Sequence, residues 1–467
     1  MYGVAAPASR VAACSLALGM MASVPAHAVE YGWLVGGGLE YSDNIDREAD
    51  DQKDGEWIRD VRAGLTLREE TSRFEADFDG LVQLEDYADN AFSGGVLFEG
   101  TGSVEAQLVP GDRVTWMAAD SFQQVPEITR SVDTRANEQN ANAFVTGPDV
   151  ELPLGAGTLA RASARWGDYY FEETDEDHTR NVLQIGAARR ISSVSEVGLY
   201  GRTEDVTFDD EEVDTEADDP IYREDFETNS AFGRYERAFA NQGRVTIDLG
   251  GYEVEREQLD DFDGVLAQLD ARRGLGARSE LGFRVSQGPT DIGSGLASSA
   301  DDPLEADTRG ASITGDVGEE QAGRAFYSHR FGRFSFTLSG GLSEEQYRED
   351  DELDREAAYA GIDLDYVVNP RRTVFADFGR SRSEYAVQVD LDDSDRDYND
   401  YDDYWVTVGF DQRLGRALTL TGAVEQNRRD AHGGGIDYTE NRARVTLVYG
   451  FGHPDVVGDS ALFDEDV

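Results

Sequence analysis

Two residue types are almost missing from this chain. Cys14 is the only cysteine and Lys53 the only lysine, so nearly all of the positive charge comes from arginine. Cys14 lies in an N-terminal segment that we expect to be removed on export, which would leave the mature chain without cysteine. Disulfides are then excluded, and noncovalent burial must hold the fold together.

Long apolar runs are missing as well. No stretch of about 18 consecutive apolar residues follows the N-terminal segment, which excludes a membrane protein built from helices. A transmembrane β-barrel is not excluded, because apolar and polar residues alternate along its strands and average out in a hydropathy window.

The N-terminus predicts export. Arg10 precedes an apolar stretch at residues 11–21, and Ala26 and Ala28 fit a small-residue cleavage signal. The apolar stretch is too short to span a bilayer. We therefore expect a signal peptide at residues 1–28, cleaved near Ala28, a barrel domain at residues 29–451 and a periplasmic tail at residues 452–467.

The mature chain is strongly acidic. Removing Arg10 leaves 41 basic against 95 acidic residues, a formal net charge of −54. Such a surface repels nucleic acid, so we expect no nucleic-acid partner, and it suits cations or high salt. Acidity of this degree also occurs in disordered chains, but the regular spacing of the 22 phenylalanines and 20 tyrosines argues against disorder.

Apolar residues recur at every second position along most of the chain. Side chains of a strand point alternately to its two faces, so each such segment has one apolar and one polar face. Short turns with Gly, Pro, Asn and Asp alternate with longer acidic segments, which are typical of the two ends of an outer-membrane barrel. The pattern predicts an all-β, antiparallel transmembrane β-barrel of about 20 strands, in a range of about 16–22, with strands of about 10–14 residues.

A soluble β-propeller or sandwich is the alternative all-β reading. No repeat of about 40–50 residues is visible, as a propeller would require. The apolar stripes are also longer than ordinary strands of about 5–6 residues. Both observations favour the membrane barrel.

The last strand carries the clearest signal. Its apolar face consists of Val445, Leu447, Tyr449 and Phe451, preceded by Ala443, and it resembles the terminal signal that the barrel assembly machinery reads. Trp33, Trp57, Trp116 and Trp166 also fall on faces predicted to point outward, where aromatic rings suit the headgroup region. Trp405 falls on the inner face of its strand.

The opening of the chain resembles a known family. Residues 39–45, with Tyr41, Asp43 and Asn44, are similar to the Tyr-x-Asp-Asn opening of outer-membrane barrels associated with exosortase/PEP-CTERM systems and exopolysaccharide operons. The turn at residues 108–114 is similar to the Leu-Val-x-Asp-Arg turn of that family. The resemblance implies a barrel that serves the making, export or anchoring of extracellular polysaccharide, and it supplies no catalytic residues.

Signals for enzymatic chemistry are weak. No histidines pair at zinc-ligand spacing, and a nucleophile-elbow motif is absent. His329, beside Ser328, is the only strand-borne candidate for a serine hydrolase, and a polar wall residue is the favoured reading. Asp393, Asp395 and Asp397 have calcium-loop spacing but lack the glycine and glutamate of an EF-hand. We expect no enzyme and no cofactor.

The inner faces mix charges of both signs. The predicted lumen-lining residues are Asp60, Arg62, Arg68, Glu75, Asp77, Asp79, Glu85, Glu99 and Glu105. They predict an acidic, water-filled conduit, unless they only pair across strands and solvate a wall. The long connection at residues 287–321 is either a constriction loop or a surface loop.

Three functions fit these expectations. The first is a channel-like barrel of extracellular polysaccharide export or surface attachment in the outer membrane of a Gram-negative bacterium. The others are a general cation-preferring diffusion porin and a closed structural barrel. Expected partners are outer-membrane lipid and lipopolysaccharide, the barrel assembly machinery, and polysaccharide or its export proteins.

Overall fold

The structure is a computed structural model. It describes residues 29–88, 92, 94–111, 113–127, 132, 134–209, 212–214, 221–240, 243–291, 315–386, 400–432 and 435–451. The predicted signal peptide, the predicted tail and the segment with Asp393, Asp395 and Asp397 lie outside the described residues. Among the residues described, no helix is long and apolar enough to cross a membrane.

Twenty strands form a single antiparallel sheet, as the sequence predicted. In chain order they are β1 (Glu30–Ser42), β2 (Glu56–Glu70), β3 (Phe74–Tyr87), β4 (Val96–Val109), β5 (Val114–Pro126), β6 (Glu138–Gly155), β7 (Thr158–Phe171), β8 (His178–Ser192), β9 (Ser195–Phe208), β12 (Phe226–Ala238), β13 (Arg244–Arg256), β14 (Phe262–Gly276), β15 (Ser279–Thr290), β16 (Gly318–Phe331), β17 (Phe334–Tyr347), β18 (Arg355–Asn369), β19 (Arg372–Tyr385), β20 (Tyr401–Arg413), β21 (Leu418–Ala431) and β22 (Tyr438–Phe451).

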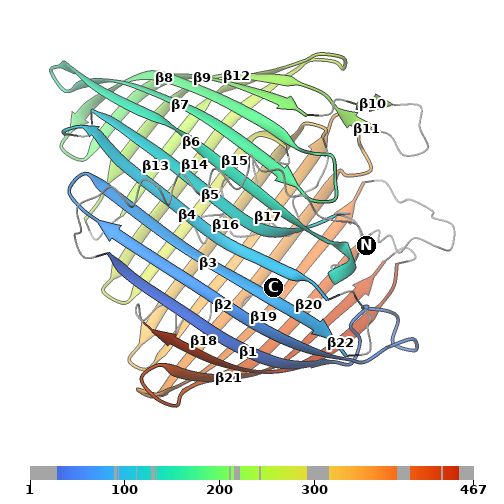
Figure 1. The fold of residues 1–467 in the computed structure, drawn as a ribbon. Coiled ribbons are helices and arrows are strands. Elements are labelled where there is room, and N and C mark those ends of the chain that lie inside the picture. Colours follow the sequence, from blue (N-terminus) through green and yellow to red (C-terminus); the bar gives the residue numbers. More distant parts are fainter. Residues whose placement is uncertain are drawn as a thin grey trace.

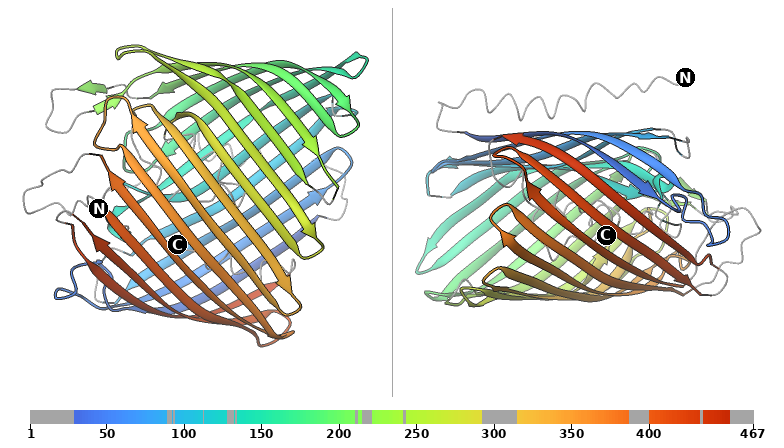
Figure 2. Two further views of the ribbon diagram at one scale, coloured as in Figure 1. Left: turned by 180° about the vertical axis from the view of Figure 1, so that it is seen from behind. Right: turned by 90° about the horizontal axis from the view of Figure 1, so that it is seen from below.

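The sheet closes on itself. The first strand pairs with the last, from Trp33 opposite Phe451 to Ser42 opposite Arg442. Figures 1 and 2 show the resulting barrel, with strands tilted across its wall. Closure removes the exposed strand edges at which sheets aggregate, because every strand is paired on both sides. The two faces of each strand can then differ in polarity along its full length.

The connections alternate between a short-turn end and a long-loop end of the barrel. Two or three residues join β2 to β3, β8 to β9 and β16 to β17, whereas β1 to β2, β9 to β12 and β15 to β16 are joined by long segments. Tight turns favour glycine, and Gly111 and Gly332 adopt positive φ angles of 81° and 57°. β1 begins and β22 ends at the short-turn end.

Details of the elements depart from expectation at several points. The strands of the barrel run from 12 to 18 residues, longer than expected, with β6 the longest. A small hairpin of β10 (Glu212–Asp214) and β11 (Ile221–Arg223) forms in the connection before β12, where we expected only a loop. β8 begins at His178, whose ring is buried against those of Tyr169 and Phe208.

An apolar belt surrounds the outer wall. Its side chains are exposed, as with Leu199 (74%) on β9 and Leu342 (69%) on β17, and they alternate with polar residues on the inner face. On β17 the belt runs from Phe334 to Leu342. With about 3.3 Å per residue and a tilt near 40°, nine residues give a height of about 23 Å, close to the ~25 Å of a membrane-facing band.

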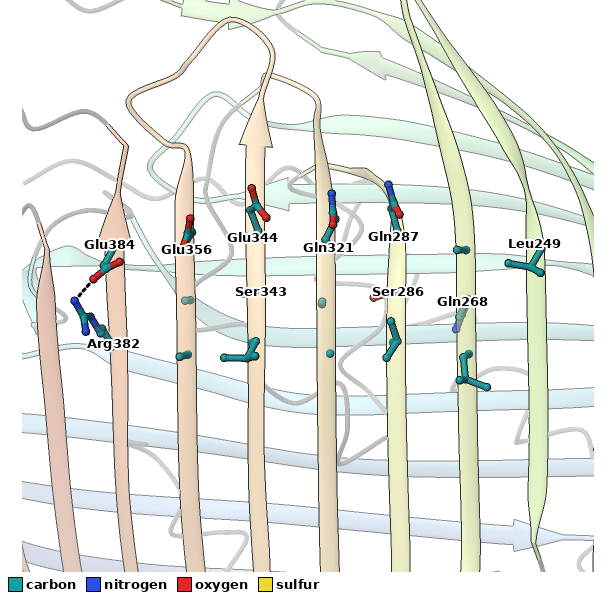
Figure 3. A pocket seen from close by; sticks show the side chains of 18 of the residues that line it. Leu249, Gln268, Ser286, Gln287, Gln321, Ser343, Glu344, Glu356, Arg382 and Glu384 are labelled. Carbon is teal, nitrogen blue, oxygen red and sulfur yellow. Dashed lines mark hydrogen bonds and ion pairs between the residues drawn. The ribbon is translucent and has the colours of Figure 1, made fainter.

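The strands continue above the belt at the long-loop end. There the outward side chains become polar, and five of them occupy one row across adjacent strands in Figure 3: Gln287, Gln321, Glu344, Glu356 and Glu384. Below this row lies a shallow outer hollow of about 820 Å³, lined by Leu249, Val285 and Leu342 among others. The row marks the upper border of the belt.

Candidate functional site: the lumen wall

All nine predicted lumen residues belong to three adjacent strands, β2, β3 and β4. They lie on the face opposite the exposed apolar residues, such as Val61 on β2, Val82 on β3 and Phe98 on β4. This arc of the wall, which we call the acidic arc, holds seven carboxylates and two arginines: Asp60, Arg62, Arg68, Glu75, Asp77, Asp79, Glu85, Glu99 and Glu105.

The two arginines of the acidic arc are paired. The Nε of Arg62 donates to Asp60 at 2.8 Å, and both side chains are buried. The Nε of Arg68 lies 2.8 Å from Asp77, and one of its Nη atoms lies 3.6 Å from Asp79. Arginine therefore neutralises only part of the arc.

The other carboxylates of the arc meet hydrogen-bond donors or one another. Glu85 accepts hydrogen bonds from Gln83 at 2.9 Å and from the Tyr87 hydroxyl at 2.8 Å, and it also lies 3.8 Å from the Nε of Arg135. Glu75 on β3 and Glu105 on β4 are direct cross-strand neighbours, and both are exposed. Like charges directly opposite each other destabilise a sheet unless water or counterions screen them. The two facing carboxylates therefore depend on screening by water or counterions.

A second stretch of the inner wall is rich in arginine. β7 carries Arg161 and Arg165, β8 carries Arg180, and β9 carries Arg202, each on the inner face. The period-2 pattern of β7, β8 and β9 carries the signal that could have identified these residues, which are absent from the predicted lumen set.

These arginines are matched by acids. Arg161 lies 3.0 Å from Glu151, Arg165 lies 2.6 Å from Asp149, and Arg202 lies 2.5 Å from Glu204. The β7–β9 wall is therefore close to neutral, and the acidic arc keeps an excess of negative charge.

Three aromatic rings line the inner wall of β18, β19 and β20. Tyr359, Phe375 and Trp405 each cover a glycine on the neighbouring strand, where an added Cβ would fall within 2.4 Å of the ring. This contact explains the inward position of Trp405, since its indole replaces the side chain that Gly379 lacks.

Carboxylates lie beside these rings. Asp363 on β18 and Asp377 on β19 are direct cross-strand neighbours on the same inner face. We call the combination of Tyr359, Phe375, Trp405, Asp363 and Asp377 the aromatic strip. Flat rings next to hydrogen-bond acceptors can stack against the C–H faces of sugars and accept their hydroxyl groups.

The tip of the β15–β16 hairpin leaves the wall and bends into the barrel. β14 begins at Phe262, but its pairing with β15 stops at Ala267 opposite Gln287, so the last residues of β15 pair only with β16. Val317 at the tip is buried among residues of β9, β12 and β13. The Tyr252 hydroxyl on β13 donates to Glu319 at 2.9 Å.

Two buried ion-pair networks hold this tip. Arg180 lies 2.5 Å from Glu204 and also contacts Asp291 at the end of β15. Arg256, 1% exposed, lies 2.7 Å from Glu224 and 3.1 Å from Asp316. Within the connection at residues 287–321, Asp291 and residues 316–319 therefore lie inside the barrel, as a constriction loop requires, while residues 292–314 lie outside the described part.

The predicted hydrolase pair does not assemble. Ser328 and His329 point to opposite faces of β16, and the Nδ1 of His329 instead lies 2.5 Å from the Oγ of Ser279. No carboxylate among the described residues contacts His329, so the residue that would orient a catalytic imidazole is missing there. No group of three or more potential metal ligands occurs among the described residues.

The predicted assembly signal lies on the outer wall. Val445, Leu447, Tyr449 and Phe451 are exposed on β22, and the rings of Tyr449 and Phe451 lie 5.7 and 6.4 Å from that of Trp33. The apolar face is therefore placed where a partner could reach it. Its recognition by the assembly machinery stays a prediction.

Comparison with family models and with curated proteins finds no match. Among solved structures, a mutant of the ferric enterobactin receptor of Pseudomonas aeruginosa is 10% identical, with 90% of this chain and 80% of that chain covered and a TM-score of 0.43. OccK2 of the same organism is 10% identical, with 92% and 99% covered and a TM-score of 0.37. The FrpB iron transporter of Neisseria meningitidis is 9% identical, with 90% and 82% covered and a TM-score of 0.43. The functional argument rests on this chain's own residues.

Proposed function

We propose that this chain is a channel of the outer membrane of a Gram-negative bacterium that passes small hydrophilic solutes and prefers cations. The carrying observation is the inversion of polarity across a closed wall: an apolar belt outside and the acidic arc inside. A soluble barrel has no reason to expose so much apolar surface in one continuous band. A barrel of about 20 strands is also wide enough to enclose water.

Cation preference follows from the distribution of charge on the inner wall. The arginines of β7–β9 are neutralised by neighbouring acids, whereas the carboxylates of β2–β4 outnumber their two arginines. A conduit with low-dielectric walls concentrates ions of the opposite sign. The inward β15–β16 tip narrows the conduit without adding unpaired positive charge, since Arg180 and Arg256 are both paired.

Selectivity can be measured on the refolded protein in a planar bilayer with a salt gradient. We expect open steps and a cation-selective reversal potential. The variant E75Q/E99Q/E105Q removes three exposed carboxylates of the acidic arc and should shift the reversal potential towards zero. The matched control E227Q/E253Q/E255Q removes three carboxylates from the outer wall and should leave it unchanged.

Two results would contradict the proposal. Absence of conductance from inserted protein would indicate a closed structural barrel. Equal selectivity in the two triple variants would mean that the acidic arc does not face the ion path.

The aromatic strip favours a second candidate, in which the solute is a saccharide chain. Sugars stack on aromatic rings, and the contact contributes most where acceptors lie beside the ring. This candidate is the one compatible with a role in extracellular polysaccharide export or attachment. A linear cello-oligosaccharide added to the bilayer should then interrupt the current of the native channel, and W405L should shorten the interruptions. If the current is not interrupted, the saccharide candidate is wrong and only the cation channel remains.

A further inference from the structure

Positive charge gathers at the short-turn end of the barrel. Exposed arginines lie in the short turns or in the strand ends beside them, and six of these are Arg113, Arg189, Arg278, Arg333, Arg371 and Arg416. We call this set the arginine rim. The long-loop end is dominated by acids instead, so the two ends of the barrel have opposite charge.

The guanidinium groups of the rim are available for binding. Among the described residues, no hydrogen bond or ion pair is formed by the guanidinium groups of Arg113, Arg278, Arg371 and Arg416. Two of the acids at this end, Glu196 and Glu280, are paired with Arg161 and Arg272, and the exposed Glu70 lies in the β2–β3 region, which carries no arginine of the rim. The rim therefore presents uncompensated positive charge.

Exposed apolar side chains accompany these arginines in the turns. Leu275 lies close to Arg278 in sequence, Leu414 close to Arg416, and Phe331 close to Arg333, and all three apolar side chains are more than half exposed. Turns that project into water do not need such residues. Apolar and cationic side chains that lie at the same height fit the interfacial zone of a bilayer. There the apolar side chains enter the acyl region and the cationic side chains contact the headgroups.

The position of the arginine rim relative to the apolar belt agrees with a location in the interfacial zone of a bilayer. On β17 the apolar belt begins at Phe334, directly after Arg333, and on β18 it reaches Tyr366, five residues before Arg371. At the opposite end the belt stops below the strand ends, at the row of Glu344 and Glu356. The bilayer core is therefore flush with the short turns, and the arginines lie at the level of lipid phosphates.

We propose that the arginine rim binds anionic phospholipid headgroups of the periplasmic leaflet. This inference rests on the proposed function, which places the short turns at the periplasmic side. A guanidinium group forms paired hydrogen bonds with phosphate oxygens, and its positive charge favours lipids with net negative charge. The rim would enrich such lipids around the channel and set its depth in the membrane.

Quenching of tryptophan fluorescence by brominated lipids tests the proposal. Trp33 on β1 and Trp116 on β5 lie near the short-turn end, so the barrel is studied in a background in which the other three tryptophans, Trp57, Trp166 and Trp405, are replaced by phenylalanine. At low salt, brominated phosphatidylglycerol should associate about fivefold more tightly than brominated phosphatidylcholine. This factor corresponds to about 1 kcal/mol, the contribution of one arginine to the binding of one lipid. The preference should fall at high salt.

Matched variants locate the source of any preference. R113Q/R278Q/R371Q/R416Q removes four rim arginines and should abolish the preference for phosphatidylglycerol. The control R59Q/R348Q/R382Q/R428Q removes four arginines from the long-loop end and should retain it. Equal quenching by the two lipids in the native sequence would overturn the proposal, as would a preference that survives in the rim variant. Absence of quenching by either lipid would instead contradict the membrane insertion on which the proposed function depends.

Discussion

Arginines have opposite environments at the two ends of the barrel. At the long-loop end, arginines are buried with their acids: Arg256 is almost inaccessible between Glu224 and Asp316. At the short-turn end, arginines such as Arg371 and Arg416 are exposed, and their guanidinium groups form no hydrogen bond or ion pair with the described residues. A buried ion pair requires partners held in place by surrounding structure, whereas a charge in a two-residue turn keeps its water.

The difference shows where structural constraint is concentrated. The long-loop end folds back into the lumen and must satisfy every polar group that it buries, which the backbone contacts of Asp316 with Val317, Glu349 and Asp350 illustrate. The short-turn end only reverses the chain. Substitutions should therefore disturb folding at the first end and membrane contacts at the second.

The largest effect is expected at Arg256. The substitution R256Q would leave Glu224 and Asp316 buried without their cation, at a cost of about 3–5 kcal/mol. The inward tip should loosen, which hydrogen exchange of residues 315–319 would detect, and single-channel conductance should rise. The matched control R428Q breaks an exposed pair with Asp430 and should cost at most about 1 kcal/mol. Equal effects would remove the distinction between buried and exposed pairs.

The border of the apolar belt can be located on one strand. Leu338 and Gln346 lie on the same outer face of β17, the first within the belt and the second above it. An arginine facing the lipid core costs about 2–4 kcal/mol, and near the interface about 0–1 kcal/mol. L338R should therefore reduce refolding stability in vesicles, measured by urea titration, while Q346R should not. A similar loss in both variants would place the border elsewhere.

The smallest effect concerns pH at the long-loop end. Burial raises the pKa of Glu176 from 4.5 to about 7, although Arg223 opposes the shift. The folded loop then holds its proton more tightly than the unfolded loop. Its stability should be greatest below pH 4.5 and should be lost as the pH rises through about 7.

Hydrogen exchange of residues 172–177 measures this dependence. Opening of the loop should become more frequent by at most about tenfold per pH unit, because a single proton is involved. E176Q cannot ionise and should show no such dependence. A native loop whose exchange follows only the intrinsic pH effect would contradict the assignment to Glu176.

Much of the fold could be predicted because its pattern is local. Alternation at every second residue identified a closed antiparallel barrel, the number of strands and the inward face of residues such as Asp60 and Glu105. It could not predict pairing within that face. Arg62 meets Asp60 on its own strand, whereas Arg68 meets Asp77 on the next one, a choice made by register and rotamer rather than by period.

The sequence by itself determined the architecture and the polarity of each face, since both depend on the geometry of single strands and on the residues of short turns. The tertiary structure decided which side chains contact each other inside the barrel. Arg180 reaches Asp291, 111 residues away, only because the β15–β16 tip bends inward. Trp405 covers Gly379 only because the register of β19 and β20 places the two residues opposite each other. Contacts across a lumen depend on the curvature of the whole sheet, and no local pattern encodes that curvature.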